Sequence, residues 1–373
     1  MSRIRGQWFE GWFLRLTDHD AASTVSVIFG SLRRQRRPAS HEGPFDEHLI
    51  AVGYADGRDG AEHTQQLLLS GPSVRLTGGN VRSRSPPAAI SRELGISPNR
   101  IGPQLSWWSQ QHGGMHVRGD AAELDLSLPG GMRLVANISA ARVHWDPTRP
   151  DTYGPEGWLS RTGLLPCHYF VHSFGSPTTY TLTHAADGRR RLSGHAVAHV
   201  ERNWGDSFPS GWVWAQAAAA HGRAYLVLTG GRFVIGPLTT ESYVIGLRSV
   251  GGGGAGGDDG LSWDFRTTDL DRVVDVRRPC DGLLSVNATS RNGRRRLELV
   301  LHAPPSTFGE ALHVPTSDRG FSKEPGCREA HTAVVRIRAW EILRRRGQRD
   351  EEVQRLQAEV PMAVLEFGGN FQC

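Results

Sequence analysis

Cysteine is scarce in this chain of 373 residues, and the four that occur are far apart: Cys167, Cys280, Cys327 and Cys373. None of them forms a C-x-x-C pair, so neither a zinc site nor a disulfide framework is expected, and the pattern favours a reducing compartment. Long apolar runs are also missing. Because a membrane-spanning helix needs about 20 consecutive apolar residues, no transmembrane helix is predicted.

Several catalytic and cofactor-binding signatures are missing as well. The 16 histidines show no H-E-x-x-H or comparable spacing, and we therefore predict no metal. The G-x-S-x-G turn that presents a serine nucleophile does not occur. The glycine-rich residues 251–260 lack the Gly-Lys-Ser/Thr ending of a phosphate-binding loop, so we interpret them as a hairpin insertion and not as a nucleotide site.

Strong net charge is absent too. Lys and Arg number 43 against 38 Asp and Glu, and the resulting +5 is too small and too dispersed to indicate a nucleic-acid partner. The one dense basic run is R-R-Q-R-R at residues 33–37. It is typical of a solvated loop; the alternative is peripheral contact with anionic lipid, where each basic residue contributes about 1 kcal/mol. The first motif begins at Phe9, so no targeting segment is visible. The oligomeric state stays open.

Short alternating segments separated by turns dominate the chain, which contains 45 Gly and 21 Pro. This pattern predicts an all-β fold. The expected strands include residues 25–29, 66–70, 124–128, 132–138, 225–229, 243–247, 284–289 and 297–302. The last two flank Asn292-Gly293, a strong hairpin signal. Only residues 350–359 are typical of a helix, with Val353, Leu356 and Val360 on one side. Residues 83–99 are expected to be a loop or a short helical cap.

The most informative segment is residues 199–216, which combine acid, base, amide and three tryptophans. Its Gly, Asp, Ser and Pro residues predict a turn between Asn203 and Gly211. We therefore expect a hairpin between a strand ending near Glu201 and one beginning at Trp212. On the second strand, Trp212, Trp214 and Gln216 share one face and Val213, Ala215 and Ala217 the other.

These residues resemble the central signature of tocopherol cyclases, usually written E-K-N-W-G, F-P and W-x-W-x-Q. Here it reads E-R-N-W-G at 201–205, F-P at 208–209 and W-V-W-A-Q at 212–216. Residues 9–15 (F-E-G-W-F-L-R) and 362–369 (M-A-V-L-E-F-G-G) are similar to the family's first and last motifs. Arg202 replaces the usual Lys, which keeps the charge but changes its shape.

The resemblance implies two lipocalin-like antiparallel β-barrels or half-barrels packed together. We place them at residues 1–190 and 191–373, because a turn at Asp187-Gly188 precedes the strand that carries the central motif. It also implies a tocopherol cyclase, which closes a long-tailed prenylated hydroquinone, phytyl or geranylgeranyl, to a chromanol without any cofactor. The family works largely in plastids and photosynthetic membranes, and a cytoplasmic location is the alternative.

Ring closure of this kind needs a proton donor for an alkene, and such an acid is worth about 10²- to 10⁴-fold in rate. We expect Glu201 or Asp206 to be that acid, protonated in an apolar cavity of the barrel. Asn203 and Gln216 are expected to orient the quinol head. Trp204, Trp212 and Trp214 would form an aromatic wall, and Glu10, Trp12 and Arg202 complete the expected substrate-binding group.

Other interpretations are open. Glu10 and Arg202 could instead form a buried ion pair that joins two strands, with the histidines His195 and His199, which alternation places beside Glu201, facing solvent. The chain could also be a lipocalin-like carrier of an isoprenoid or lipid. A hydratase or cyclase of the same fold acting on another terpenoid is a third possibility, because a fold alone does not choose among activities.

Overall fold

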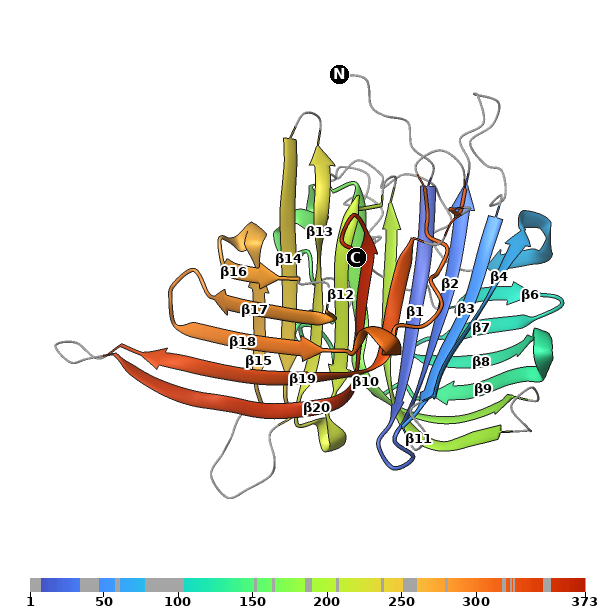
Figure 1. The fold of residues 1–373 in the computed structure, drawn as a ribbon, viewed down its shortest axis with the longest axis horizontal. Coiled ribbons are helices and arrows are strands. Elements are labelled where there is room, and N and C mark those ends of the chain that lie inside the picture. Colours follow the sequence, from blue (N-terminus) through green and yellow to red (C-terminus); the bar gives the residue numbers. More distant parts are fainter. Residues whose placement is uncertain are drawn as a thin grey trace. The chain divides into compact units, whose positions relative to one another are not determined.

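Two antiparallel β-sheets and short 3-10 turns make up the regular structure of the computed structural model (Figure 1). It describes residues 8–33, 47–57, 61–77, 104–150, 153–162, 165–184, 190–205, 208–235, 238–250, 260–278, 281–316, 320–322, 324, 326–344 and 350–372. The described residues contain no α-helix, which confirms the expected all-β class.

The first sheet has eleven strands in the order β4-β3-β2-β1-β11-β10-β9-β8-β7-β6-β5. Their bounds are β1 Trp8–Asp18, β2 Ser23–Arg33, β3 Glu47–Asp56, β4 Ala61–Ser70, β5 Val74–Thr77, β6 Gln104–Ser109, β7 Gly113–Arg118, β8 Ala121–Leu128, β9 Met132–Ile138, β10 Cys167–His184 and β11 Arg190–Gly205. The 3-10 turns are η1 Gly71–Ser73, η2 Pro129–Gly131 and η3 Gly157–Arg161.

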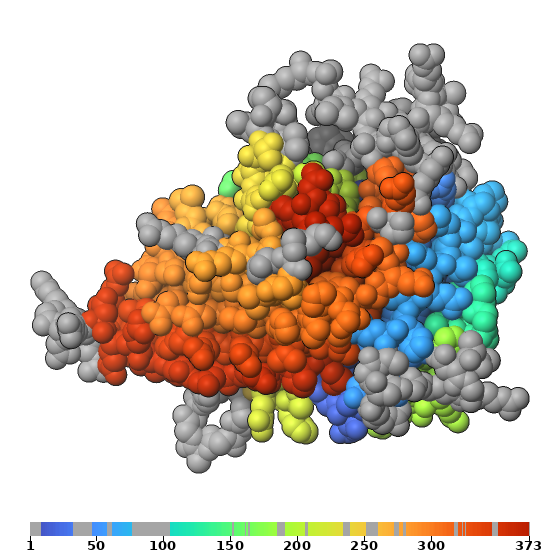
Figure 2. Space-filling model, viewed as in Figure 1, coloured from blue at the N-terminus to red at the C-terminus, as the bar shows by residue number. Residues whose placement is uncertain are grey.

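The second sheet has nine strands in the order β15-β14-β13-β12-β20-β19-β18-β17-β16. Their bounds are β12 Gly211–Ala218, β13 Tyr225–Ile235, β14 Leu238–Arg248, β15 Ser262–Arg266, β16 Arg272–Arg277, β17 Leu283–Thr289, β18 Arg295–His302, β19 Cys327–Leu343 and β20 Glu351–Gly369. Its 3-10 turns are η4 Ala220–Gly222, η5 Thr267–Asp269 and η6 Pro305–Thr307. β20 and its neighbour β19 form a continuous band on the surface in Figure 2.

Each sheet curls around its own hydrophobic core. In the first sheet, Leu67 of β4 and Val74 of β5, at opposite ends of the strand order, pack into one cluster with Trp12 and Leu14 of β1. In the second, Trp263 of β15 and Val276 of β16 do the same. A flat sheet would not bring its two edge strands to one core, so both sheets are barrel-like.

The chain divides into two compact units that are not continuous in sequence. Unit 1 comprises residues 1–58, 64–208 and 313–325, and unit 2 comprises 59–63, 209–312 and 326–373. The main change from one unit to the other therefore falls at residues 208 and 209. A cut after residue 190 would separate β10 from β11, which pair from Cys167↔Gly205 to His184↔Arg190.

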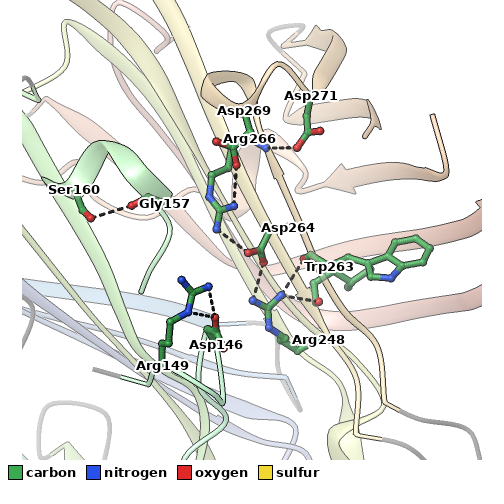
Figure 3. A network of polar contacts seen from close by, with 11 residues as sticks. Asp146, Arg149, Gly157, Ser160, Arg248, Trp263, Asp264, Arg266, Asp269 and Asp271 are labelled. Atoms are coloured by element: carbon green, nitrogen blue, oxygen red, sulfur yellow. Dashed lines mark hydrogen bonds and ion pairs between the residues drawn. The ribbon is translucent and has the colours of Figure 1, made fainter. Parts of the chain in front are cut away.

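Arginine–aspartate contacts hold one edge of unit 2 (Figure 3). Asp264 of β15 lies between two buried arginines: Oδ1 is 2.7 Å from Arg248 Nη2, and Oδ2 is 2.6 Å from Arg266 Nη2. Arg266 also contacts Asp269 at 3.1 Å. Arg248 Nη1 donates to the carbonyl oxygens of Leu247 and Trp263, at 2.9 Å each. Pairing of this kind allows guanidinium groups to be buried.

The turn expected at Asn292-Gly293 is confirmed, since β17 and β18 pair on either side of it. Gly293 has φ +68°, the left-handed conformation that such turns require. All eight segments expected to be extended lie within strands. Residues 83–99 and 251–259 lie outside the described residues.

Two local expectations are wrong. Residues 350–359 are not a helix but form the first half of β20, paired with β19. A bulge opposite Ala339/Trp340 skips Arg355 and so turns Val353 and Leu356 to the same face. The apolar spacing of three therefore imitates a helix. The expected hairpin is wrong too, because β11 pairs with β1 and β10, whereas β12 pairs with β13 and β20 in the other sheet.

Candidate active site

Successive residues of the E-R-N-W-G motif point to opposite faces of the first sheet. Arg202 is paired with Trp12 and Trp204 with Glu10, on the face that carries the core of unit 1, here called the inner face. Glu201 is paired with Phe13 and Asn203 with Gly11 on the opposite, outer face. The motif therefore supplies two separate groups of side chains.

Glu201 is the centre of the outer group and is only 5% exposed. Its Oε2 accepts a hydrogen bond from the Tyr169 hydroxyl and lies 2.7 Å from His199 Nε2. His199 is buried, so the alternative that both histidines face solvent is wrong for this residue. His195, four residues earlier on the same face of β11, is exposed. Tyr169 and His199 therefore contact the same carboxylate oxygen.

Tyr169 reaches Glu201 from the neighbouring strand β10, where a carboxylate fixes its backbone. Glu156, just before η3, accepts from the Tyr169 backbone N–H at 2.6 Å and lies 3.1 Å from His168 Nδ1. His168 and Tyr169, near the start of β10, thus point to opposite faces of the sheet. The segment before η3 anchors the residue that holds Glu201.

Asn203 belongs to the outer group because Gly11 leaves space for it. A Cβ atom at Gly11 would overlap Asn203 Oδ1. The glycine of the first motif therefore has a steric role, which is to let the amide of the central motif lie over the backbone of β1. Sequence spacing alone does not reveal this dependence.

The inner group contains the ion pair that the sequence suggested as an alternative. Arg202 Nη2 lies 3.0 Å from Glu10 Oε1, and Trp12 Nε1 donates to the same oxygen at 3.1 Å. The Arg202 guanidinium carbon lies 4.6 Å from the ring centre of Trp204 and 5.4 Å from that of Trp12. Both aromatic contacts favour a cation at this place.

The remaining expected site residues lie on β12 in unit 2. Trp212, Trp214 and Gln216 are all buried, and they point away from the core of unit 2, to which Val213 and Ala215 contribute. This alternation is as expected. Glu366 of β20, paired with Trp214, accepts a hydrogen bond from Trp212 Nε1. Glu366 lies within the last motif, M-A-V-L-E-F-G-G, but its contact with Trp212 depends on the pairing of β20 with β12 and does not follow from the motif alone.

Cys327 lies beside these residues, paired with Gly368. Burial, together with the carboxylates of Glu366 and Glu329, raises the pKa of its thiol well above the usual value. A thiol of this kind stays protonated and is a poor nucleophile. The acid candidate Asp206 lies outside the described residues.

The structure therefore divides the expected site into three groups: the outer face of unit 1, with Glu201 and Asn203; the inner face of unit 1, with Glu10, Trp12, Arg202 and Trp204; and β12 of unit 2, with Trp212, Trp214 and Gln216. Trp204 and Glu201 do not share one face, which corrects the expectation that Trp204 walls the acid inside the barrel. Tyr169 is one of the weaker candidates in the sequence and is not among the expected site residues, because its contact with Glu201 depends on the pairing of β10 with β11.

Two further properties concern metals and membranes. No group of three or more His, Cys, Asp or Glu side chains suited to a metal ion occurs in the described ranges. Within the same ranges, no helix has the length and hydropathy needed to cross a bilayer.

The sequence pattern of the tocopherol cyclase-like family matches residues 145–369, which is more than half of the 373 residues. The chain belongs to this family. The matched range includes β11, β12 and β20, and so all of the central and last motifs. Membership confirms the resemblance that the motifs suggested.

Two curated plant proteins are similar to this family member. A probable chloroplastic tocopherol cyclase of Oryza sativa subsp. japonica is 25% identical over 257 residues, covering 64% of this chain and 49% of the rice protein. A chloroplastic tocopherol cyclase of Zea mays is 26% identical over 258 residues, with the same coverage. The chain thus spans about half the length of the curated relatives it matches.

Among solved structures, the crystal structure of CghA is similar with a TM-score of 0.53. The two chains are 12% identical, and the match covers 98% of this chain and 88% of CghA. The complex of CghA with Sch210972 gives a TM-score of 0.51. At this identity the likeness concerns the fold, and it extends over both units.

Proposed function

We propose that this family member is a cofactor-free cyclase that closes a phytyl or geranylgeranyl benzoquinol to a chromanol. Family membership supports an enzyme of the cyclase type. The observation that carries the proposal is the buried Glu201 carboxyl, whose Oε2 contacts both the Tyr169 hydroxyl and His199. A fixed carboxyl shielded from water is what alkene protonation requires.

In the proposed reaction, Glu201 transfers its carboxyl proton to the trisubstituted alkene of the tail, and a tertiary carbocation forms. The phenol oxygen of the same substrate then attacks the cation and closes the ring. The phenolic proton returns to the Glu201 carboxylate, so the acid is restored and no electrons are gained or lost. Tyr169 and His199 stabilise the carboxylate between the two transfers, because both can donate to Oε2.

The expected rate enhancements show which residues contribute most to the reaction. A positioned acid gives about 10²- to 10⁴-fold. An aromatic face over a cation contributes about 0.5 to 2 kcal/mol, which is less than about 30-fold. We therefore assign the main role to the acid and a secondary one to the tryptophans. In this assignment Asn203, which lies on the same face as Glu201, orients the quinol head.

The inner group has a different proposed role. Glu10, Trp12, Arg202 and Trp204 lie on the face opposite Glu201. They would contribute to activity by holding β1 and β11 in register behind the acid, not by contact with the alkene. Asp206 stays a second candidate for the proton donor.

The test is to incubate the purified protein with geranylgeranyl or phytyl benzoquinol and to identify the products. A chromanol supports the proposal, a hydrated tail identifies a hydratase, and unchanged bound ligand identifies a carrier. E201Q should lose cyclisation by about 10²-fold or more and keep substrate binding. E359Q, which changes an exposed carboxyl on β20, is the matched control. Full activity of E201Q together with loss of activity in D206N would transfer the acid role to Asp206.

We also propose peripheral contact with a membrane, because a substrate with a long prenyl tail partitions into lipid. The names of both plant relatives carry the word chloroplastic, which supports a plastid or photosynthetic membrane as the place of action. Flotation with vesicles that contain anionic lipid tests the contact. Recovery of all the protein in the lipid-free fraction would contradict it.

A further inference from the structure

Two arginines of unit 2 lie together at one end of its barrel, in a group of side chains that the proposed reaction does not use. Arg232, near the end of β13, and Glu241, near the start of β14, are cross-strand neighbours. They lie in the same alternating rows as Leu228 and Ile245 of the core, so they continue the inward face of the barrel beyond its apolar part. Arg278, just after β16, joins them from a third segment. The mouth of a β-barrel is a common place for a ligand site.

Both guanidinium groups share one carboxylate oxygen. Arg232 Nη2 lies 3.0 Å and Arg278 Nη2 3.5 Å from Glu241 Oε1. Glu241 Oε2 accepts a hydrogen bond from the Tyr243 hydroxyl at 2.6 Å, and this hydroxyl accepts one from Arg278 Nη1. The guanidinium carbons of Arg278 and Arg232 lie 3.7 Å and 5.2 Å from the ring centre of Phe371. These contacts hold the two cations close together and in fixed positions.

The group carries one positive charge in excess. Burial alone would raise the pKa of Glu241, but hydrogen bonds from Tyr243 and Arg232 and the charge of Arg278 outweigh it and lower that pKa. Burial and the hydrogen bond to Glu241 raise the pKa of the Tyr243 hydroxyl. The carboxylate is therefore charged and the hydroxyl neutral at pH 7, so one of the two arginines has no balancing charge within the group.

Another pair of neighbouring arginines in unit 2 is balanced. Arg248 and Arg266 share Asp264, and Arg266 also contacts Asp269, so two carboxylates face two guanidinium groups (Figure 3). The side chains of these two arginines are only 5% and 4% exposed. A network that only holds strands together can thus be both buried and charge-balanced. The group around Arg232 is neither.

Solvent reaches the unbalanced arginines. The side chain of Arg232 is 38% exposed and that of Arg278 is 19% exposed. Within the described part of the chain, the Arg232 guanidinium donates one hydrogen bond, from Nη2 to Glu241, which leaves its Nε and Nη1 groups available to a ligand. A tetrahedral oxyanion can accept from two guanidinium groups at once, whereas the two oxygens of a carboxylate match a single one.

We propose that Arg232 and Arg278, at the end of the unit 2 barrel, form a binding site for a phosphate group. The two guanidinium groups donate to different oxygens of the phosphate, whose negative charge balances the excess positive charge. Phe371 and Tyr243 hold the arginines in place. A soluble phosphate ester and a phospholipid headgroup both present this oxyanion. The site shares no residue with the proposed acid group at Glu201 and does not depend on the cyclisation, because binding alone defines it.

The test titrates the unaltered protein with inorganic phosphate at constant ionic strength and follows the Nε resonances of ¹⁵N-labelled arginine. Phosphate should shift the resonances of Arg232 and Arg278, and acetate at the same concentration should not. R232Q and R278Q should each bind phosphate about tenfold more weakly, because a charge-assisted hydrogen bond is lost. R296Q is the matched control, since Arg296 is 36% exposed, pairs with Glu352 and lies over the ring of Trp340 in the same unit.

Two further arms identify the source of the phosphate. Glycerol 3-phosphate represents a soluble ester, and vesicles of phosphatidylcholine and phosphatidylglycerol represent lipid headgroups. Binding of glycerol 3-phosphate that R232Q weakens and R296Q does not would identify a soluble ester. Sedimentation with the vesicles that R232Q weakens and R296Q does not would identify a headgroup.

No response to phosphate in any of the three arms, equal shifts with phosphate and acetate, or equal weakening by R232Q and R296Q would overturn the inference. The group would then be a structural network only. Because phosphate and acetate are compared on the unaltered protein, the result stands even if R232Q or R278Q fails to fold. E201Q should bind phosphate normally, so a failure of the proposed acid and a failure of this site are distinguishable.

Discussion

At the scale of single residues, the two-residue alternation of a strand correctly places Glu201 and His199 on one face of β11 and Arg202 on the other. The cost of burying an unpaired carboxylate suggests the Glu10–Arg202 pair, and in the structure the two side chains lie 3.0 Å apart. Alternation could not identify Tyr169 as the partner of Glu201. That contact depends on the cross-strand register of β10, which bulges beyond Val171. Contacts along one strand follow from the sequence, whereas contacts between distant strands require the register.

Loss of the charge on Glu10 should destabilise the fold. E10Q keeps an oxygen that accepts from Trp12 but leaves Arg202 without its carboxylate, in a place where the two side chains are 7% and 12% exposed. Removing one partner of a buried pair costs about 3–5 kcal/mol of the free energy of unfolding. Urea unfolding measures this value.

The control for E10Q is E359Q, which removes an exposed pair between Arg336 and Glu359. Both side chains of this pair are more than half exposed, so the change should be below about 1 kcal/mol. Equal stabilities of E10Q and the unaltered protein would show that the inner ion pair contributes nothing to the fold.

His48 makes stability depend on pH. Its imidazole is buried, with Nδ1 2.8 Å from Ser31 Oγ, and burial lowers its pKa from 6.5 to about 4, against the opposing effect of a backbone hydrogen bond with Gly71. Between these two pH values the unfolded chain binds a proton that the folded chain does not. The free energy of unfolding should therefore be highest above pH 6.5 and fall by up to about 3 kcal/mol as the pH drops to 4.

The variant H48Q should remove this part of the pH dependence. His172, whose pKa burial also lowers, is present in both proteins and contributes equally to their pH dependence. The measured quantity is therefore the loss of unfolding free energy between pH 7 and pH 4.5, determined from urea unfolding and compared between H48Q and the unaltered protein. An equal loss of unfolding free energy in H48Q and in the unaltered protein would mean that His48 does not cause the pH dependence.

At the scale of elements, the sequence predicts strands well where turns are explicit and the alternation is unbroken, as at Asn292-Gly293. It fails at β20, where the skipped Arg355 changes the period, and at the connection from β11 to β12, where turn-forming residues join two different sheets. Turn chemistry shows that a strand ends. It does not show whether the next strand returns to the same sheet.

The close approach of β12 and β20 depends on Gly368. A Cβ atom there would overlap the indole of Trp212, which lies directly over this residue. G368A should displace the indole from Glu366 and destabilise unit 2 by about 1–3 kcal/mol through overpacking. The measurement is the Trp212 indole N–H resonance together with the melting temperature.

G119A is the comparison for G368A. Gly119 has φ +60° and no atom within 4 Å of an added Cβ, so its substitution should cost about 1–2 kcal/mol of backbone strain only. The Trp212 resonance should then stay unchanged. A shift of the Trp212 resonance in G119A, or an unshifted Trp212 resonance in G368A, would contradict the steric role of Gly368.

At the scale of the whole molecule, the sequence indicates two all-β halves but not how they share the chain. Residues 313–325 come late in the sequence and belong to unit 1, and residues 59–63 come early and belong to unit 2. No local pattern indicates such an exchange. It becomes visible only in contacts such as the hydrogen bond from the Phe321 backbone N–H to Glu47 Oε2, at 3.1 Å.

Phe321 provides the test of this exchange. Its side chain is 6% exposed and packs with Phe9, Leu32 and Leu49, so F321A should cost about 3–5 kcal/mol. Because all of its partners lie in unit 1, hydrogen exchange should quicken in β2 and β3 and stay unchanged in β13 and β14. F265A, which empties a fully buried position of β15, should give the reverse pattern. If F321A instead weakened protection in β13 and β14 as much as in β2, residues 313–325 would stabilise the two units equally, and their assignment to unit 1 would be wrong.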